Sequence, residues 1–193
     1  MKRPKQIRNV DAEVTHWSDD ISGEVVLEIV TALRKRLRRV DRSHDIPYLA
    51  GYSRDGRTVF IDRHMPRSFL VGKRRVRTDR FLITHEVVEK ALLDQLRLHY
   101  LHAHQIALRT EQAAVRAAGV NWRDYDRFTK SNEKAIADER LKRVPRDLDL
   151  TPYRDEHDFD LLKRMQAARR RSERSEPELP RRPDGKYKPQ MTA

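Results

Sequence analysis

The chain contains no cysteine, and this absence narrows the chemistry open to it. Disulfide bonds are excluded, and so are metal sites that are built on thiolates. Any metal ion bound by this protein must therefore be held by histidine, aspartate or glutamate side chains.

Long hydrophobic runs are also missing. No apolar stretch of the 193 residues approaches the roughly 18 residues that a membrane-spanning helix needs. The opening residues, Met-Lys-Arg-Pro-Lys-Gln, lack the apolar segment of a secretory signal. The sequence therefore predicts a cytoplasmic protein that has no membrane partner.

Basic residues clearly outnumber acidic ones. Lysine and arginine number 42 against 30 aspartate and glutamate residues, which gives a formal net charge of +12 at pH 7. Such an excess favours polyanionic partners and permits non-specific nucleic-acid binding. Many of the basic residues lie in two short runs, 34–39 and 169–174, which are typical of solvated helix ends and tails. Nucleic acid is a candidate partner through these segments.

The length is enough for one ordinary domain and a tail. We predict a single α+β domain over residues 1–172 and a basic, proline-rich, disordered tail over residues 173–193. A helix is expected from Ser18 or Ser22, because an apolar face follows at Val26, Ile29, Val30, Leu33 and Leu37.

A β-hairpin and a series of helices are expected next. Residues 46–52 and 57–62 are β-rich and flank Asp55-Gly56, a pair that suits a tight turn. After a connection punctuated by proline and glycine, helices are predicted over residues 78–97, 100–118, 122–143 and 151–171. Thr78 is the expected N-cap of the first of them. The fold is therefore predicted to be mostly helical, with a small antiparallel sheet that precedes a long helix.

The helix over residues 78–97 carries ionisable residues on an apolar face. His85 and Glu89 are four residues apart and so project from the same side. The rest of that side is aliphatic, with Leu82, Leu92 and Leu96. Burying an unpaired imidazole or carboxylate is costly, so polar groups on this face need partners.

The next helix interrupts its apolar face in the same way. Residues at alternating spacings of three and four form this face, namely Leu101, His104, Leu108, Glu111 and Val115. A short turn at residues 97–99 would make the two helices antiparallel. Counted outward from that turn, Glu89 lies near His104, and His85 lies near Glu111. Two imidazoles and two carboxylates in one apolar interface indicate a metal site.

The other histidines are weaker candidates. His102 lies about 200° around the helix from His104, on a polar face, so both cannot face one ion. The sequence defines no orientation for His64, which lies in the connection after the hairpin. The remaining histidines are interpreted as surface residues: His16, His44, His99 and His157.

The motif His85-Glu86-x-x-Glu89, on a helix after a strand pair, resembles the active-site helix of zincin-type metallopeptidases. Their signature, His-Glu-x-x-His, supplies two metal ligands one turn apart and a glutamate that acts as general base. The resemblance makes His85 the first ligand and Glu86 the general base. Glu89 stands where these enzymes have the second histidine, and carboxylates also bind zinc.

The resemblance covers residues 46–111 and implies a zincin-like domain with a third ligand on the later helix. The implied zinc ligands are His85, Glu89 and His104. Glu111 would be a fourth ligand or would orient one of the three. The same donor set suits Fe²⁺ or Mn²⁺. A metal-dependent hydrolase acting on a peptide or protein is implied, with strand 58–62 at the edge of its cleft pairing with an extended peptide.

A second interpretation needs neither metal nor catalysis. His85 and Glu89 could pair within their helix, and Glu111 or Tyr100 could satisfy His104 in a buried polar network. The protein would then be a basic binding or structural protein, contacting nucleic acid or an acidic protein through residues 34–36 and 169–171. Either interpretation is compatible with a dimer, and the sequence leaves the oligomeric state open.

Overall fold

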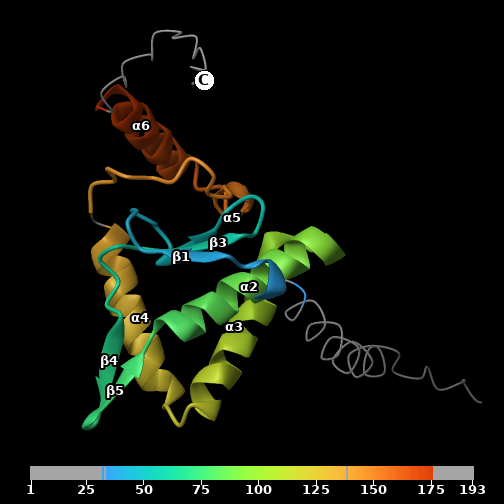
Figure 1. The fold of residues 1–193 in the computed structure, drawn as a ribbon, viewed down its shortest axis with the longest axis vertical. Coiled ribbons are helices and arrows are strands. Elements are labelled where there is room, and N and C mark those ends of the chain that lie inside the picture. The colour runs from blue at the N-terminus through green and yellow to red at the C-terminus, as the bar shows by residue number, and fades with distance from the viewer. Residues whose placement is uncertain (1–31, 33, 138, 176–193) are drawn as a thin grey trace, which may run out of the picture.

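The computed structural model describes residues 32, 34–137 and 139–175 (Figure 1). Its elements in chain order are β1 (Arg39–Asp41), β2 (Ala50–Tyr52), β3 (Thr58–Ile61), β4 (Ser68–Val71), β5 (Arg74–Arg77), α2 (Asp79–Leu96), α3 (Tyr100–Ala117), α4 (Trp122–Ala137), α5 (Thr151–Asp155) and α6 (Phe159–Ser175). Most of the predicted N-terminal helix, His16 and most of the predicted tail lie outside the described residues, but residues 32 and 34–36, near the end of that helix, are helical. Within the described part of the chain, no helix is both long enough and apolar enough to cross a bilayer. The fold is mostly helical α+β with a small sheet, as predicted.

The three-stranded sheet confirms the predicted hairpin but adds a strand to it. β2 and β3 are antiparallel, and Gly56 in their turn has a φ of 67°, a left-handed conformation that favours glycine. β1 pairs in parallel with the other side of β3, which gives the order β1-β3-β2. Because β3 is the central strand, both of its main-chain edges are occupied. The expectation that strand 58–62 lies at a cleft edge and pairs with a peptide is therefore wrong.

A second hairpin, β4–β5, lies in the connection where the sequence indicates no regular structure. Phe69 pairs with Val76, and both side chains are buried on the inner face of the hairpin. Phe69 also stacks on Phe128 of α4, with ring centroids 4.8 Å apart. The strands have four residues each, which is too short to give a clear alternating pattern in the sequence.

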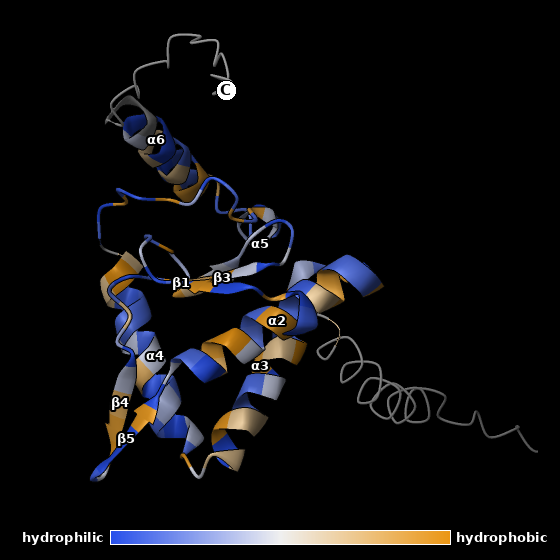
Figure 2. Ribbon diagram, viewed as in Figure 1, coloured by the Kyte–Doolittle hydropathy of each residue, from blue (hydrophilic) through white to orange (hydrophobic). Residues whose placement is uncertain are grey.

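α2 and α3 form the helical hairpin that the spacing predicts (Figure 1). Arg97 ends α2 in a left-handed conformation with a φ of 54°, and the His99 side chain accepts a hydrogen bond from the Leu101 backbone N–H at the start of α3. Hydrophobic and hydrophilic residues are interspersed along both helices (Figure 2). The packed side chains between them are small or aliphatic and include Val88, Leu92, Ala103 and Ala107. These small residues let the helices approach closely, so polar side chains on the two helices come into contact.

The last predicted helix is broken in the structure. α5 begins at Thr151 as expected, but His157 has a φ of 58°, which is incompatible with a continuous right-handed helix. The Asp158 carboxylate then accepts a hydrogen bond from the Leu161 backbone N–H and caps α6. α6 continues to Ser175, beyond the predicted domain boundary at residue 172.

α4 ends at Ala137 and not at residue 143, because the following segment is bonded elsewhere. The Asp45 carboxylate accepts hydrogen bonds from the backbone N–H groups of Lys142, at 2.5 Å, and Arg143, at 2.7 Å. Arg63 Nε donates to the other oxygen of this carboxylate at 2.5 Å. Asp45 therefore ties the segment after α4 to the loops beside the sheet.

Asp45→Ala is expected to lower the free energy of unfolding by about 2–4 kcal/mol, since a buried carboxylate with several charge-assisted hydrogen bonds is lost. Denaturant titration measures the change. Asp126→Ala is the control, because it removes only the ion pair with the exposed Lys130 on α4 and should cost less than about 1 kcal/mol. Similar losses in the two variants would show that the Asp45 contacts do not hold this segment.

Candidate metal centre

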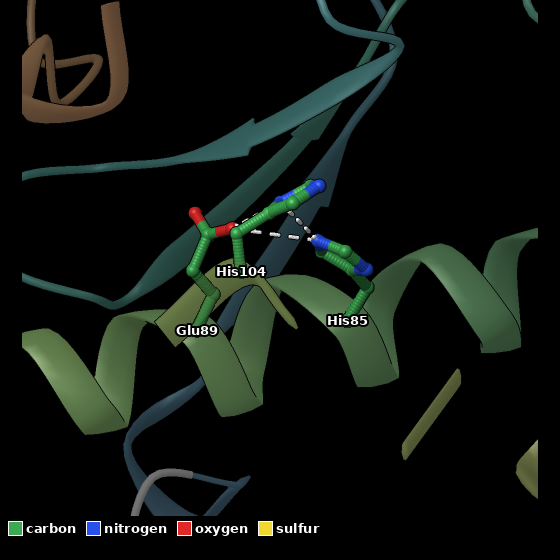
Figure 3. A group of neighbouring side chains, drawn as sticks. All are labelled: His85, Glu89 and His104. Carbon is green, nitrogen blue, oxygen red and sulfur yellow. Dashed lines mark hydrogen bonds and ion pairs between the residues drawn. The ribbon is translucent and has the colours of Figure 1, made fainter. Parts of the chain in front are cut away.

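Three ionisable side chains from α2 and α3 converge on one point (Figure 3). Nε2 of His85 lies 3.2 Å from Nδ1 of His104 and 3.4 Å from Oε2 of Glu89. The same Glu89 oxygen lies 2.9 Å from His104 Nδ1, which closes a triangle. A tetrahedral ion with ligand bonds of about 2.0–2.2 Å has its ligand atoms roughly 3.3–3.6 Å apart. The triangle is therefore close in size to one face of such a site and needs only a small expansion.

The predicted pairings across the helical hairpin are confirmed. Glu89 contacts His104, and His85 contacts Glu111. His85 and Glu89 are buried, whereas the His104 side chain is 35% exposed and forms the solvent side of the triangle. Metal binding itself stays a prediction, because the same contacts also form without an ion.

Glu111 lies behind His85 and outside the triangle. His85 Nδ1 donates a hydrogen bond to Glu111 Oε2 at 2.9 Å, on the opposite side of the ring from the triangle. The other oxygen of Glu111 accepts a 2.5 Å hydrogen bond from the Tyr125 hydroxyl of α4. This geometry fits a residue that orients a ligand and does not fit a fourth ligand.

Two further tyrosines hold the triangle in place. The Tyr52 hydroxyl of β2 donates to Glu89 Oε1 at 3.0 Å, which leaves Oε2 to face the histidines. The Tyr100 hydroxyl lies 3.4 Å from His104 Nδ1, one turn earlier on α3. Tyr100 and His104 are four residues apart on one helix, so this contact could be predicted from the sequence. No local pattern indicates the contacts of Tyr52 and Tyr125.

Glu86 is buried beside the triangle without a partner. Only 7% of the residue is exposed, and its carboxyl group makes no hydrogen bond to any of the described residues. Burial and the neighbouring charge of Glu89 raise the pKa of Glu86 well above its usual value. It lines the same pocket as Glu89 and His104. A carboxyl group with a raised pKa that lines a pocket is typical of functional sites.

The pKa values of His85 and Glu89 are shifted by the oppositely charged groups around them. Burial acts to lower the pKa of His85, but hydrogen bonds with Glu111 and Glu89 outweigh it and raise this pKa well above the usual value. Burial acts to raise the pKa of Glu89, yet hydrogen bonds from His104 and His85 hold it at about 2. The metal-free cluster is therefore ion-paired, and a metal ion would have to displace the proton on His85.

The cluster opens into a narrow pocket. Its walls come from β2, α2, α3 and α5 and include the aromatic residues Tyr48, Tyr52, Tyr100 and Tyr153. The volume is about 40 Å³, which holds a few water molecules, since one water needs roughly 10–15 Å³ by this measure. A peptide side chain does not fit this pocket unless the lining residues move.

The weaker histidine candidates lie elsewhere. His102 is exposed on α3, on a different face from His104. His64 is paired with Glu139, at 2.8 Å, and with Asp62. Asp62 and Asp45 could hold an ion together with His64, but backbone N–H groups already bind both carboxylates. Among the surface assignments, His99 and His157 are exposed and His44 is partly exposed.

Comparison with known proteins does not identify a family for this chain. The chain matches no protein family, no curated protein and no solved structure. The function must therefore be argued from the side chains of the site.

Proposed function

We propose that this protein is a metal-dependent hydrolase whose metal ion is held by His85, Glu89 and His104. The observation that carries the proposal is the carboxyl group of Glu86, which makes no hydrogen bond to the described residues and lines the pocket beside a triangle of two imidazole nitrogens and one carboxylate oxygen. The oxygens of this group are not sealed from solvent but reach the pocket beside the triangle, where a general base must meet water. The donor set suits zinc, and it also suits Fe²⁺ or Mn²⁺.

Each residue of the site has a separate role in this proposal. Glu86 takes a proton from the attacking water and returns it to the leaving group. The bound ion would polarise the substrate carbonyl and lower the pKa of water. Glu111 fixes Nδ1 of His85, so in the neutral ring the Nε2 lone pair points into the triangle. Tyr52 fixes the orientation of Glu89 in a similar way.

A peptide bond is the substrate class that the zincin resemblance suggests. The size of the pocket admits only a small group such as a scissile carbonyl, and β3 offers no free edge for an extended chain. Fluorogenic peptide mixtures, incubated with protein loaded separately with Zn²⁺, Fe²⁺ or Mn²⁺, test the assignment. Cleavage that a chelator abolishes would support it. Absence of cleavage with all three ions would remove the peptidase assignment.

Zinc is expected to raise the midpoint of thermal unfolding by roughly 5–11 °C when free zinc is about 100 times Kd. Binding to the folded state alone adds about 2.7 kcal/mol at that ratio, and a chain of this size shifts by about 2–4 °C per kcal/mol. Calorimetry of chelator-treated protein that carries no histidine tag measures the shift. Elemental analysis of untreated protein should find about one ion per chain.

Magnesium is the matched control for this measurement. It has the same charge as zinc, but it prefers oxygen ligands in an octahedral arrangement, so it should bind poorly to this donor set. Equal shifts with both ions would point to non-specific stabilisation. No shift with Zn²⁺, Fe²⁺ or Mn²⁺ would favour the metal-free polar network.

A further inference from the structure

Positive charge without acidic partners gathers on the β4–β5 hairpin and the first turn of α2. The exposed cations here are Arg67, Lys73, Arg74, Arg75, Arg77 and Arg80. Asp79 is the only acidic residue between positions 67 and 80, and Arg42 Nη1 binds its carboxylate at 2.7 Å. The charge of the hairpin therefore stays uncompensated. This surface is separate from the basic runs at residues 34–39 and 169–174.

The side-chain contacts of these arginines are with neutral groups. Arg75 donates a 3.3 Å hydrogen bond to the Ser68 hydroxyl. The guanidinium of Arg80 lies 4.6 Å from the ring centroid of Phe81. The side chain of Arg77 makes no ion pair or hydrogen bond with any residue that the structure describes. None of these contacts cancels a charge, so all three side chains can attract an anion.

The hairpin presents two of the charges on its outer face. Arg75 and Arg77 flank Val76, which is buried on the inner face, so both arginines project outward. Leu70 is paired with Arg75 on the neighbouring strand and is 64% exposed on the same face. The hairpin lies at one end of the molecule, and its tip is hydrophilic (Figures 1 and 2).

The hairpin is held firmly and borders a hollow. Arg74 Nη2 donates to the carbonyl oxygens of Ala118 and Gly119 at 3.1 and 3.0 Å, which fixes the strand against the α3–α4 corner. A hollow of about 670 Å³ lies beside β5, lined by its arginines, by the apolar side chains of Val40 and Ile83, and by Asp79, whose carboxylate Arg42 binds. Arginine side chains beside such a hollow can contact phosphate groups and position the protein on a nucleic acid.

We propose that this hairpin surface binds the phosphodiester backbone of double-stranded nucleic acid. Guanidinium groups bind phosphate oxygens bidentately, and a two-stranded ribbon is narrow enough for the roughly 12 Å major groove of B-DNA. The uncompensated charge supplies affinity that depends steeply on salt. This surface shares no residue with the triangle of the metal centre, so its function is separate from the proposed hydrolysis.

The test is binding of a fluorescently labelled DNA duplex of about 20 base pairs, followed by anisotropy as salt is raised. Arg75→Ala/Arg77→Ala removes two phosphate contacts. The slope of log K against log salt is therefore expected to become less steep by about 1.8. Affinity at about 0.1 M salt is expected to fall between about 10- and 100-fold.

Three matched variants separate this surface from general charge, from folding and from the metal centre. Arg123→Ala/Arg127→Ala removes the same charge from exposed positions on α4 and should change affinity by less than about 2-fold. Arg75→Lys/Arg77→Lys keeps the charge and should keep the salt slope. His104→Ala should bind DNA unchanged, so failure of the hydrolase proposal does not affect this one.

Three results would overturn the proposal. The first is an absence of duplex binding by the unmodified protein at about 0.05 M salt. The second is an equal loss in the hairpin and α4 alanine variants. The third is displacement of the duplex by poly-L-glutamate as effectively as by unlabelled duplex, which would make the surface a site for acidic protein.

Discussion

Glu86→Gln is expected to bind zinc as the unmodified protein does and to lose about 10²–10⁴-fold in hydrolytic turnover. The amide keeps the size of the side chain but cannot take a proton from water. Metal binding should survive, because Glu86 lies outside the triangle of His85, Glu89 and His104. Peptide cleavage and zinc titration on the same preparation measure the two quantities. Retained turnover would remove Glu86 as the base, and lost zinc would place it among the ligands.

The same substitution has a second consequence for folding stability. The raised pKa of Glu86 means that ionisation favours the unfolded state once the pH exceeds the usual value of 4.5. A neutral amide removes this penalty, so the variant should be more stable than the unmodified protein near pH 7 and equally stable below about pH 4. Denaturant titrations at both pH values measure it. Glu133→Gln, at an exposed position on α4, is the control and should leave turnover, zinc binding and stability unchanged.

The helices of the site could be predicted because their signals are local. α2 and α3 carry regular apolar spacings and are joined by a short turn, so the facing of Glu89 and His104 follows from counting. The N-cap of α2, however, differs from the prediction. Thr78 stands at the expected N-cap of α2, but its hydroxyl donates to the Pro66 carbonyl at 2.7 Å and does not cap the helix. A tertiary contact has taken the group that the sequence assigns to the cap.

The rest of the site depends on contacts between distant parts of the chain. Tyr52 is 37 residues from the glutamate it contacts, and Tyr125 is on a different helix from Glu111. The end of α4 also depends on a distant contact. Asp45 binds the backbone N–H groups of two residues that lie 97 and 98 positions later in the chain. Propensity and periodicity are local quantities, so they carry no signal for any of these partners.

The strand order shows which expectation taken from the zincin motif could not be checked in the sequence. The motif around His85 predicts a helix with His85 and Glu89 one turn apart, and α2 carries both residues in this way. The peptide-binding edge, however, depends on strand order, and the parallel pairing of β1 with β3 cannot be read from either strand alone. The residues that could do chemistry were therefore predictable, whereas the surface that would hold a substrate was not.

His104→Ala is expected to weaken zinc binding by more than about 100-fold, because it removes an atom of the triangle itself. His104 is the best position for this test. Its side chain is 35% exposed, so truncation should cost little stability, whereas His85→Ala would remove a buried imidazole that contacts both Glu111 and Glu89. His102→Ala removes an exposed imidazole from the same helix and should leave zinc affinity unchanged. Isothermal titration calorimetry measures all of these affinities.

Glu111→Gln then separates a ligand from a residue that orients one. Of the three residues in the triangle, its carboxylate contacts only His85, at the nitrogen that faces away from the triangle. The amide should therefore reduce zinc affinity by about 10–100-fold, less than His104→Ala does. Tyr125→Phe removes the hydrogen bond behind that carboxylate and should have a smaller effect again. The expected loss of zinc affinity therefore decreases with the distance of the substituted group from the triangle. A loss in Glu111→Gln as large as that in His104→Ala would make Glu111 a ligand, and unchanged affinity in His104→Ala would mean that the three side chains hold no ion.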